Sequence, residues 1–226
     1  MKYKAVVFDM DGVIFDSERL SKEVWLEIAA ERGIEGFAPV YDEIIGVNKA
    51  GGRQIVCDAY GQDFPFDEIH AEAALRKLPK CPNGHYPLKD GIVELLAFLK
   101  EHKYKVGLAS STEEAVVRMH LEKSGLISYF DCLICGNMVK HSKPHPEIFL
   151  MACETLGVKP EETYIIEDSY NGIRAAHAAG AFAIMVPDLK MPTEEMRELS
   201  NLILKDLYEV RKHLNKGVFC YNQNSE

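Results

Sequence analysis

Apolar and polar positions alternate along this chain in two different periods. Short apolar runs of four to six residues are typical of strands buried in a parallel sheet. They lie at Lys4–Phe8, Lys105–Ala109, Cys132–Cys135, Tyr164–Glu167 and Ala181–Val186. Between the later runs, apolar residues recur every three or four positions, which predicts amphipathic helices. This alternation of strands and helices predicts an α/β fold, a doubly wound and Rossmann-like core built on a parallel sheet.

The region between the first two predicted strands carries helical patterns only. The first helix has one apolar face, with Ser17 as its expected N-cap and Gly33 as its expected stop. Further helices are predicted at about 40–46, 50–60 and 66–78. The stretch Pro79–Gly91 holds three prolines and two glycines, which is typical of a linker. We therefore expect an all-helical cap domain at 17–85, inserted into an α/β core formed by 1–16 and 86–226.

Five helices are predicted in the core, at 91–102, 113–124, 146–156, 171–179 and 205–215. Ser111 and Glu114 have the spacing of a capping box at the start of the second of these helices. Pro146 suits the first turn of the third helix, and Gly180 suits the end of the fourth. The stretch that follows Val186 is polar and predicts no regular element.

Composition restricts the classes of partner. The net charge is −9, from 26 basic and 35 acidic residues, with no long basic run, which argues against a nucleic-acid-binding protein. No apolar stretch has the length of a membrane span, and the N-terminus lacks the pattern of a signal peptide. The six cysteines are scattered, so we expect free thiols in a reducing compartment and a cytoplasmic protein.

Two further groups contain residue types that can bind metal ions. Cys132 and Cys135 have C-x-x-C spacing but lie within a predicted strand, without a second suitably spaced pair, so a zinc site is not expected. His141 and His145 bracket Ser-Lys-Pro in a predicted loop. We expect them to be solvated or to contact residues that themselves bind a ligand.

The first predicted strand ends on two acids, Asp9 and Asp11, followed by Gly12. Two carboxylates at the carboxyl end of a buried strand would repel each other unless a divalent cation shared the site. Ligands of open α/β sheets also bind at this edge. Taken alone, the same D-x-D-G pattern also fits a solvated turn or the start of a calcium loop.

Three later segments bring polar residues to the carboxyl ends of strands or to the loops that follow them. They contain Ser110, Ser111 and Thr112, then Lys143, and then Glu167, Asp168 and Ser169. Hydroxyls and amides at a helix N-terminus suit an anion, although these serines would serve equally as caps. Lys143 would alone be a surface lysine, and Asp168 or Ser169 an N-cap. Together they place two acidic pairs, a hydroxyl and a lysine at one sheet edge.

In this order and spacing, the four segments resemble the haloacid dehalogenase superfamily of phosphohydrolases, and among them the β-phosphoglucomutase-like phosphatases. The resemblance rests on Asp9-Met-Asp11-Gly12-Val13, Ser110, Lys143-Pro144 and Glu167-Asp168-Ser169 with Asn171-Gly172-Ile173, and it covers nearly the whole chain. It implies a Mg²⁺-dependent phosphatase of a small phosphorylated metabolite, such as a sugar or polyol phosphate.

The resemblance also implies roles for these residues. Asp9 would be the nucleophile that forms an aspartyl-phosphate, and Asp11 the general acid and base. Asp9, the backbone carbonyl of Asp11, Asp168 and Glu167 would hold Mg²⁺. The phosphoryl group would contact Ser110 and Lys143. Ser111 follows Ser110 and is a further candidate for binding the phosphate.

Residues of the insert would choose the substrate. Ile45-Gly46-Val47-Asn48-Lys49 resembles a cap loop, which makes Asn48 and Lys49 candidate substrate contacts, although Lys49 also fits a solvated helix start. Where β-phosphoglucomutases carry a histidine in the first cap helix, this chain has Ser21, which favours hydrolysis over the alternative, a sugar-phosphate mutase. A phosphoacceptor signalling domain and a non-catalytic interaction protein are weaker alternatives. We expect a monomer that binds no nucleic acid or membrane.

Overall fold

The centre of the molecule is a six-stranded parallel sheet. The computed structural model of the 226-residue chain describes residues 3–45, 47, 49–81 and 83–222, the last six of these by their backbone alone. The strands are β1 (Ala5–Phe8), β2 (Lys105–Ser110), β3 (Cys132–Cys135), β4 (Thr163–Glu167), β5 (Phe182–Met185) and β6 (Leu202–Ile203), in the order β3-β2-β1-β4-β5-β6. Every neighbouring pair is parallel. The predicted α/β class is confirmed.

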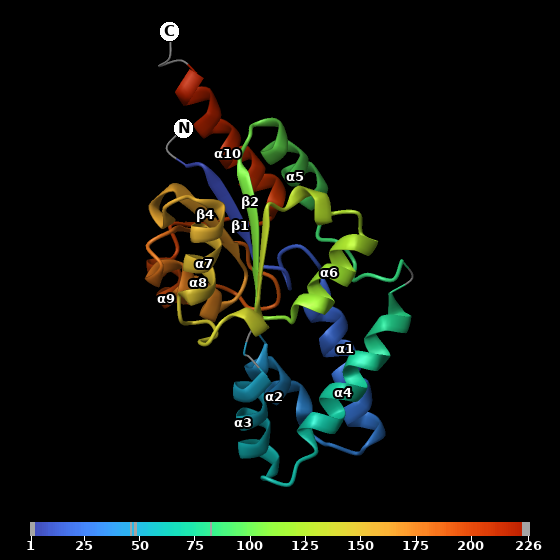
Figure 1. Cartoon of the computed structure of the whole chain (residues 1–226). Helices are drawn as coiled ribbons and strands as arrows, with labels where there is room; N and C mark the ends of the chain where they lie inside the picture. The colour runs from blue at the N-terminus through green and yellow to red at the C-terminus, as the bar shows by residue number, and fades with distance from the viewer. Residues whose placement is uncertain (1–2, 46, 48, 82, 223–226) are drawn as a thin grey trace.

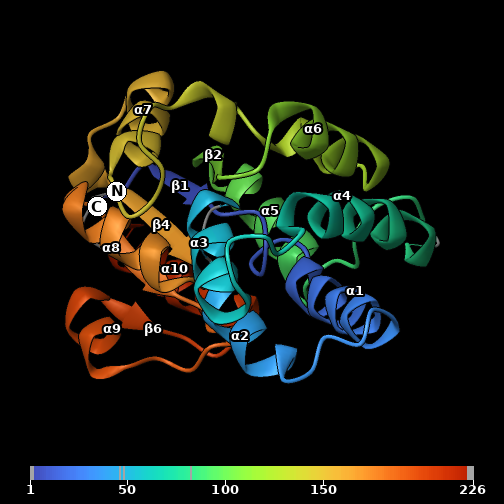
Figure 2. The same cartoon turned by 90° about the horizontal axis from the view of Figure 1, so that it is seen from below.

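Helices cover both faces of the sheet, and a further group of helices lies beyond the carboxyl ends of its strands (Figures 1 and 2). They are α1 (Ser17–Glu31), α2 (Phe37–Ile44), α3 (Lys49–Tyr60), α4 (Phe66–Lys77), α5 (Ile92–Glu101), α6 (Glu114–Lys123), α7 (Glu147–Leu156), α8 (Tyr170–Ala178), α9 (Glu194–Leu199) and α10 (Leu207–Asn222). Among the described residues, no helix is both long and apolar enough to cross a membrane.

Strand β1 is buried on both faces, which explains why its sequence is continuously apolar. Val6 and Phe8 enter a core cluster that includes residues of α5, α6 and α10. Ala5 and Val7 point the other way, into a cluster that includes residues of α7, α8 and α9. Because successive side chains of a strand face opposite sides, one four-residue strand anchors both helical layers.

Helices α1 to α4 form a separate group with an aromatic core of their own. Trp25 lies at the centre, with ring centroids 5.7 Å from Phe37 and 5.6 Å from Phe66. All four helices follow β1 and precede α5 in the chain. Figure 1 shows them gathered below the sheet, beyond the carboxyl ends of β1 and β2.

Two chain segments connect this helical group to the sheet, and they run side by side. The backbone N–H of Asp16 donates to the carbonyl of Pro87 at 2.8 Å, and that of Lys89 donates to Ile14 at 2.9 Å. The outgoing and returning segments therefore form one double connection beside the carboxyl end of the sheet.

Several local predictions are wrong. Helix α1 begins at Ser17 with Asp16 at the N-cap position, so Ser17 is not the cap. Helix α6 has Glu113 at its N-cap without a side-chain cap bond, and the N–H of Glu114 is bound by Asn137 Oδ1 instead of by Ser111. The polar stretch after Val186 contains α9 and β6, and the last helix extends to Asn222.

Candidate active site

The carboxyl ends of β1, β2 and β4 bring the predicted site residues together. The register pairs Phe8 with Leu108 of β2 and with Ile166 of β4. Asp9, one residue further, therefore comes level with Ala109 and Glu167, and its N–H donates to Ile166 at 3.0 Å. The parallel topology thus places acids from two neighbouring strands at one edge, as the sequence predicts.

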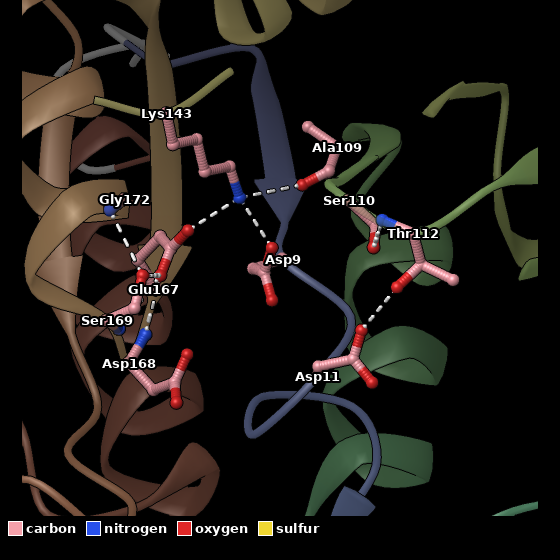
Figure 3. A network of polar contacts seen from close by, with 10 residues as sticks. All are labelled: Asp9, Asp11, Ala109, Ser110, Thr112, Lys143, Glu167, Asp168, Ser169 and Gly172. Atoms are coloured by element: carbon pink, nitrogen blue, oxygen red, sulfur yellow. Dashed lines mark hydrogen bonds and ion pairs between the residues drawn. The ribbon is translucent and has the colours of Figure 1, made fainter. Parts of the chain in front are cut away.

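Lys143 connects these strand ends (Figure 3). Its Nζ donates to Asp9 Oδ1 at 2.5 Å, to Glu167 Oε1 at 2.6 Å and to the carbonyl of Ala109 at 3.0 Å. Lys143, Asp9 and Glu167 are all buried. An ammonium group has three donors, and all three are used here. The alternative of a surface lysine is therefore excluded.

Burial and charge act in opposite directions on this group. Burial raises the pKa of Asp9 to about 8, despite the opposing attraction of Lys143. Burial also acts to lower the pKa of Lys143, but the charges of Asp9 and Glu167 outweigh it, so that pKa is raised. Burial, together with the charges of Glu167 and Asp9, raises the pKa of Asp168 well above its ordinary value. One lysine does not balance three buried carboxylates.

The second oxygen of Glu167 is held by the loop that follows β4. Glu167 Oε2 accepts from the N–H of Asp168 at 3.0 Å, from the N–H of Ser169 at 2.9 Å and from Ser169 Oγ at 3.0 Å. Ser169 Oγ also caps α8 by accepting from Gly172 N at 3.0 Å. A Cβ at Gly172 would lie 1.8 Å from Glu167 Oε1, so the helix can approach the carboxylate only without a side chain there.

Asp11 lies apart from this acidic group, on the opposite side of Asp9 in Figure 3. Its Oδ1 accepts from Ser17 Oγ at 2.6 Å, and its Oδ2 accepts from Thr112 Oγ1 at 2.9 Å. Ser17 begins α1, whereas Thr112 follows β2. The carboxylate is thus oriented by one hydroxyl from the helical group and one from the core, two contacts that the sequence analysis missed.

Gly12 allows the chain to turn sharply between Asp11 and the helical group. Its φ is +80°, a conformation that favours glycine. A Cβ at this position would lie 2.2 Å from Asp168 Oδ2. Gly12 therefore serves both the turn and the close approach of the β1 and β4 loops.

Three acids of the site could share a cation. Ligand oxygens of Asp9, Glu167 and Asp168 lie within 4.8 Å of one another, and all three side chains are buried. Carboxylate oxygens are the donors that Mg²⁺ prefers, and a divalent ion would offset the charge that Lys143 leaves unbalanced. The donor set therefore fits Mg²⁺. The side chain of Asp11 is not part of this group; its predicted contribution concerns its backbone carbonyl.

A cavity of about 590 Å³ lies between the sheet edge and the helical group. The core lines it with Asp9, Asp11, Ser110, Ser111, Lys143 and Asp168. Ser110 is fully buried, and its Oγ accepts from the N–H of Thr112 at 3.0 Å. The phosphate-binding candidates thus face the same space as Asp9 and Asp168, two of the three acids.

The helical group lines the same cavity from the other side, with Ser21, Trp25 and Lys49 among its residues. Lys49 also pairs with Asp67 at 3.0 Å, on the exposed side of α3. Asn48, the other substrate candidate, lies outside the described residues.

Comparison with known proteins identifies the family. The family model described as haloacid dehalogenase-like hydrolase matches residues 3–180. The chain belongs to the haloacid dehalogenase-like hydrolases. The match spans β1, helices α1 to α4 and the core through α8, so the family prediction and the prediction of a hydrolase are confirmed.

Individual members of this family are similar over most of the chain. The phosphorylated carbohydrates phosphatase of Thermotoga maritima is 33% identical over 177 residues, which cover 78% of this chain and 82% of that protein. The structure of CbbY from Rhodobacter sphaeroides in complex with phosphate has a TM-score of 0.74 and 27% identity, covering 92% and 96% of the two chains. The β-phosphoglucomutase of Clostridium difficile has a TM-score of 0.75, covering 96% and 99%, at 23% identity, which shows the fold alone.

Proposed function

We propose that this hydrolase is a Mg²⁺-dependent phosphatase of a small phosphorylated sugar or polyol, and that it works through an aspartyl-phosphate. The observation that carries the proposal is the position of Asp9. Its carboxylate is buried at the floor of the cavity, is bonded to Lys143 at 2.5 Å and is followed by a second carboxylate at Asp11. The similarity to a phosphorylated carbohydrates phosphatase supports the substrate class.

In the first half-reaction, a carboxylate oxygen of Asp9 attacks phosphorus and the bond from phosphorus to the ester oxygen breaks. Asp11, in its acid form, gives its proton to the leaving oxygen, so an alcohol departs. In the second half-reaction, Asp11 takes a proton from water, which attacks the aspartyl-phosphate. Inorganic phosphate leaves and the Asp9 carboxylate is restored. Ser17 and Thr112 orient Asp11 for both transfers.

Asp9, Glu167 and Asp168 would hold Mg²⁺, with the backbone carbonyl of Asp11 as a further ligand. The bound ion would shield the anionic nucleophile from the anionic phosphate. Ser110 and Lys143 line the cavity beside Asp9, where a hydroxyl and an ammonium group suit the phosphoryl oxygens.

The helical group would act as the cap that closes this space and selects the substrate. We place the cap at 17–85 and the core at 1–16 and 86–226, because the paired segments at Asp16–Pro87 and Ile14–Lys89 connect the two. Lys49 and Asn48 are the proposed contacts for the distal part of the substrate. The monomeric state and the cytoplasmic location stay predictions.

Release of inorganic phosphate tests the proposal. With Mg²⁺ present, the wild-type chain should hydrolyse members of a panel of sugar and polyol phosphates faster than nucleotides, compared by kcat/KM. Asp9→Asn should lower turnover by several orders of magnitude, since an amide of the same shape is no nucleophile. Asp42→Asn applies the same change to an exposed carboxylate of α2 and should keep full activity. If Asp9→Asn keeps a tenth of the activity, Asp9 is not the nucleophile.

Ser21 separates hydrolysis from mutase activity. This residue lines the cavity together with Tyr41, in the space where substrate would bind. A hydroxyl group does not titrate near neutral pH and cannot switch with the substrate as an imidazole could. With β-glucose 1-phosphate, glucose 1,6-bisphosphate and Mg²⁺, phosphate should appear faster than glucose 6-phosphate. The reverse order in a coupled assay would favour the mutase.

A further inference from the structure

The loop that carries Lys143 holds a second group of metal-binding side chains on its outer surface. The loop runs from β3 to α7, and His141 and His145 lie two residues before and two residues after Lys143. Glu147 begins α7. Within the described part of the chain, two groups bring ligand atoms of at least three histidine, cysteine or acidic side chains within 4.8 Å of one another. One is the acidic group of the site, and the other is this group of His141, His145 and Glu147.

The three side chains already face one another. His141 Nδ1 lies 2.7 Å from Glu147 Oε2, and His145 Nδ1 lies 3.9 Å from the same oxygen. The two imidazole rings have centroids 4.6 Å apart with an angle of 39° between their planes. The side chains of His141 and His145 are 63% and 51% exposed, so an ion can reach them from solvent.

The carboxylate of Glu147 is fixed and ionised. Its Oε1 accepts from the N–H of Lys140 at 2.8 Å, and its Oε2 accepts from the N–H of His141 at 3.0 Å. These bonds, with the one from the His141 ring, lower the pKa of Glu147. The same hydrogen bonds to Glu147 hold the loop in place before α7. The position of the His145 imidazole beside this carboxylate is not needed for them.

We propose that His141, His145 and Glu147 form a surface site for a borderline divalent transition-metal ion such as Zn²⁺. Imidazole nitrogens with one carboxylate suit Zn²⁺, Ni²⁺ or Cu²⁺, whereas Mg²⁺ prefers oxygen ligands alone. Zn–N bonds of about 2.0–2.1 Å place tetrahedral ligand atoms roughly 3.4 Å apart. The present separations of 2.7 and 3.9 Å lie on either side of that spacing. Small rotations of two exposed rings would meet it, with water as the fourth ligand.

Binding costs two hydrogen bonds and has one consequence. His145 Nδ1 accepts from the N–H of Glu147 at 3.2 Å, and His141 Nδ1 lies 2.7 Å from Glu147 Oε2; the ion would replace both bonds. An ion held by both histidines would fix the loop on either side of Lys143. The binding itself does not depend on the proposed phosphatase activity, so the two can fail separately.

The test measures Zn²⁺ binding to the full chain by competition with a chromogenic chelator, in excess Mg²⁺ so that the acidic group is occupied. Wild-type chain should bind one equivalent. His141→Ala and His145→Ala should each weaken Zn²⁺ binding at least about tenfold. Loss of a residue that only hydrogen-bonds to a metal ligand already costs about 10–100-fold in affinity, and these histidines would contact the ion directly. His177→Ala removes an exposed histidine of α8 whose Nδ1 contacts only the carbonyl of Leu199 among the contacts described, and should bind like wild type.

An Asp168→Asn variant distinguishes the two metal-binding groups. It should keep the Zn²⁺ equivalent, because Asp168 belongs to the acidic group. Loss of the equivalent in Asp168→Asn, with retention in both histidine variants, would place the ion in the acidic group and overturn the proposal. Failure of the wild-type chain to bind Zn²⁺ would overturn it as well. Co²⁺ absorption gives an independent readout, since its visible bands should weaken in the histidine variants alone.

Discussion

Replacement of Lys143 by methionine tests whether its ion pairs stabilise the fold strongly because they are buried. The change removes the charge and keeps an unbranched side chain. Two carboxylates, Asp9 and Glu167, then stay buried without the ammonium group that contacts them at 2.5 and 2.6 Å. Loss of one partner of a buried pair costs about 3–5 kcal/mol. In a domain of 150–250 residues, each kcal/mol of lost stability lowers Tm by about 2–4 °C. We therefore expect a fall in Tm of roughly 6–20 °C.

The chain offers a matched control in Lys4. Its Nζ also lies 2.5 Å from a carboxylate, that of Glu162, but the two side chains are 55% and 26% exposed, against 7% and 11% for Lys143 and Asp9. Exposed pairs contribute at most about 1 kcal/mol. Urea unfolding followed by circular dichroism, with a chelator present, should therefore show a large loss for Lys143→Met and a small one for Lys4→Met. Equal losses would refute the reasoning from burial.

The same variant should respond to pH. Lys143 acts to lower the pKa of Asp9, so its removal should raise that folded-state pKa further above the unfolded value. The folded variant then binds protons more tightly than the unfolded chain, and its stability falls as pH rises between those two pKa values. Since that pKa is already about 8 in wild type, both proteins should lose stability in parallel below about pH 8, and the difference between them should grow above about pH 8, where only the variant still loses stability through Asp9. A difference that stays constant would mean that lost packing, and not charge, is the cause.

Three further substitutions or exchanges follow from the site. Asp11→Asn should slow hydrolysis of alkyl phosphates far more than that of acetyl phosphate, whose leaving group needs no proton, and it should let aspartyl-phosphate accumulate; equal losses without a trapped phosphoenzyme would make Asp11 structural. Ca²⁺ should replace Mg²⁺ poorly, because its looser shell takes both oxygens of a carboxylate and misdirects Asp9; full activity in excess chelator would refute the metal site. Gly12→Ala should lower kcat and unfold at lower urea, since its Cβ would lie 2.2 Å from Asp168 Oδ2 at a φ of +80°; wild-type values in both assays would contradict the close approach.

The gathering of the candidate site residues could be predicted from the sequence because topology alone brings strand ends together. Asp9 and Glu167 lie within one residue of the ends of β1 and β4, and those strands are neighbours in the sheet. A buried parallel strand is a continuous apolar run, so its end is visible as the first polar residue. Lys143 is different, because it follows a loop, and only its place in the ordered set of motifs indicated its role.

Contacts between loops were the part that local patterns missed. Ser17 and Thr112 hold Asp11 from two segments that are distant in sequence, and nothing in either segment marks that approach. The capping box at Ser111 failed for the same reason, since Asn137 arrives from the segment after β3 and binds the N–H of Glu114. Strand β6 has only two residues, and it is recognisable through its pairing with β5, not through its own sequence.

The two walls of the cavity are therefore positioned by different structural features of this fold. The groups proposed to react, Asp9 and its neighbours, come from strand ends, whose positions are fixed by sheet register to within a residue. The opposite wall of the cavity comes from side chains such as Ser21 of α1, Tyr41 of α2, Lys49 of α3 and His70 of α4. Their relative positions depend on how four helices pack around Trp25. A change in that packing would move several wall residues at once and leave Asp9 in place, so the proposed substrate contacts can vary without moving the proposed nucleophile.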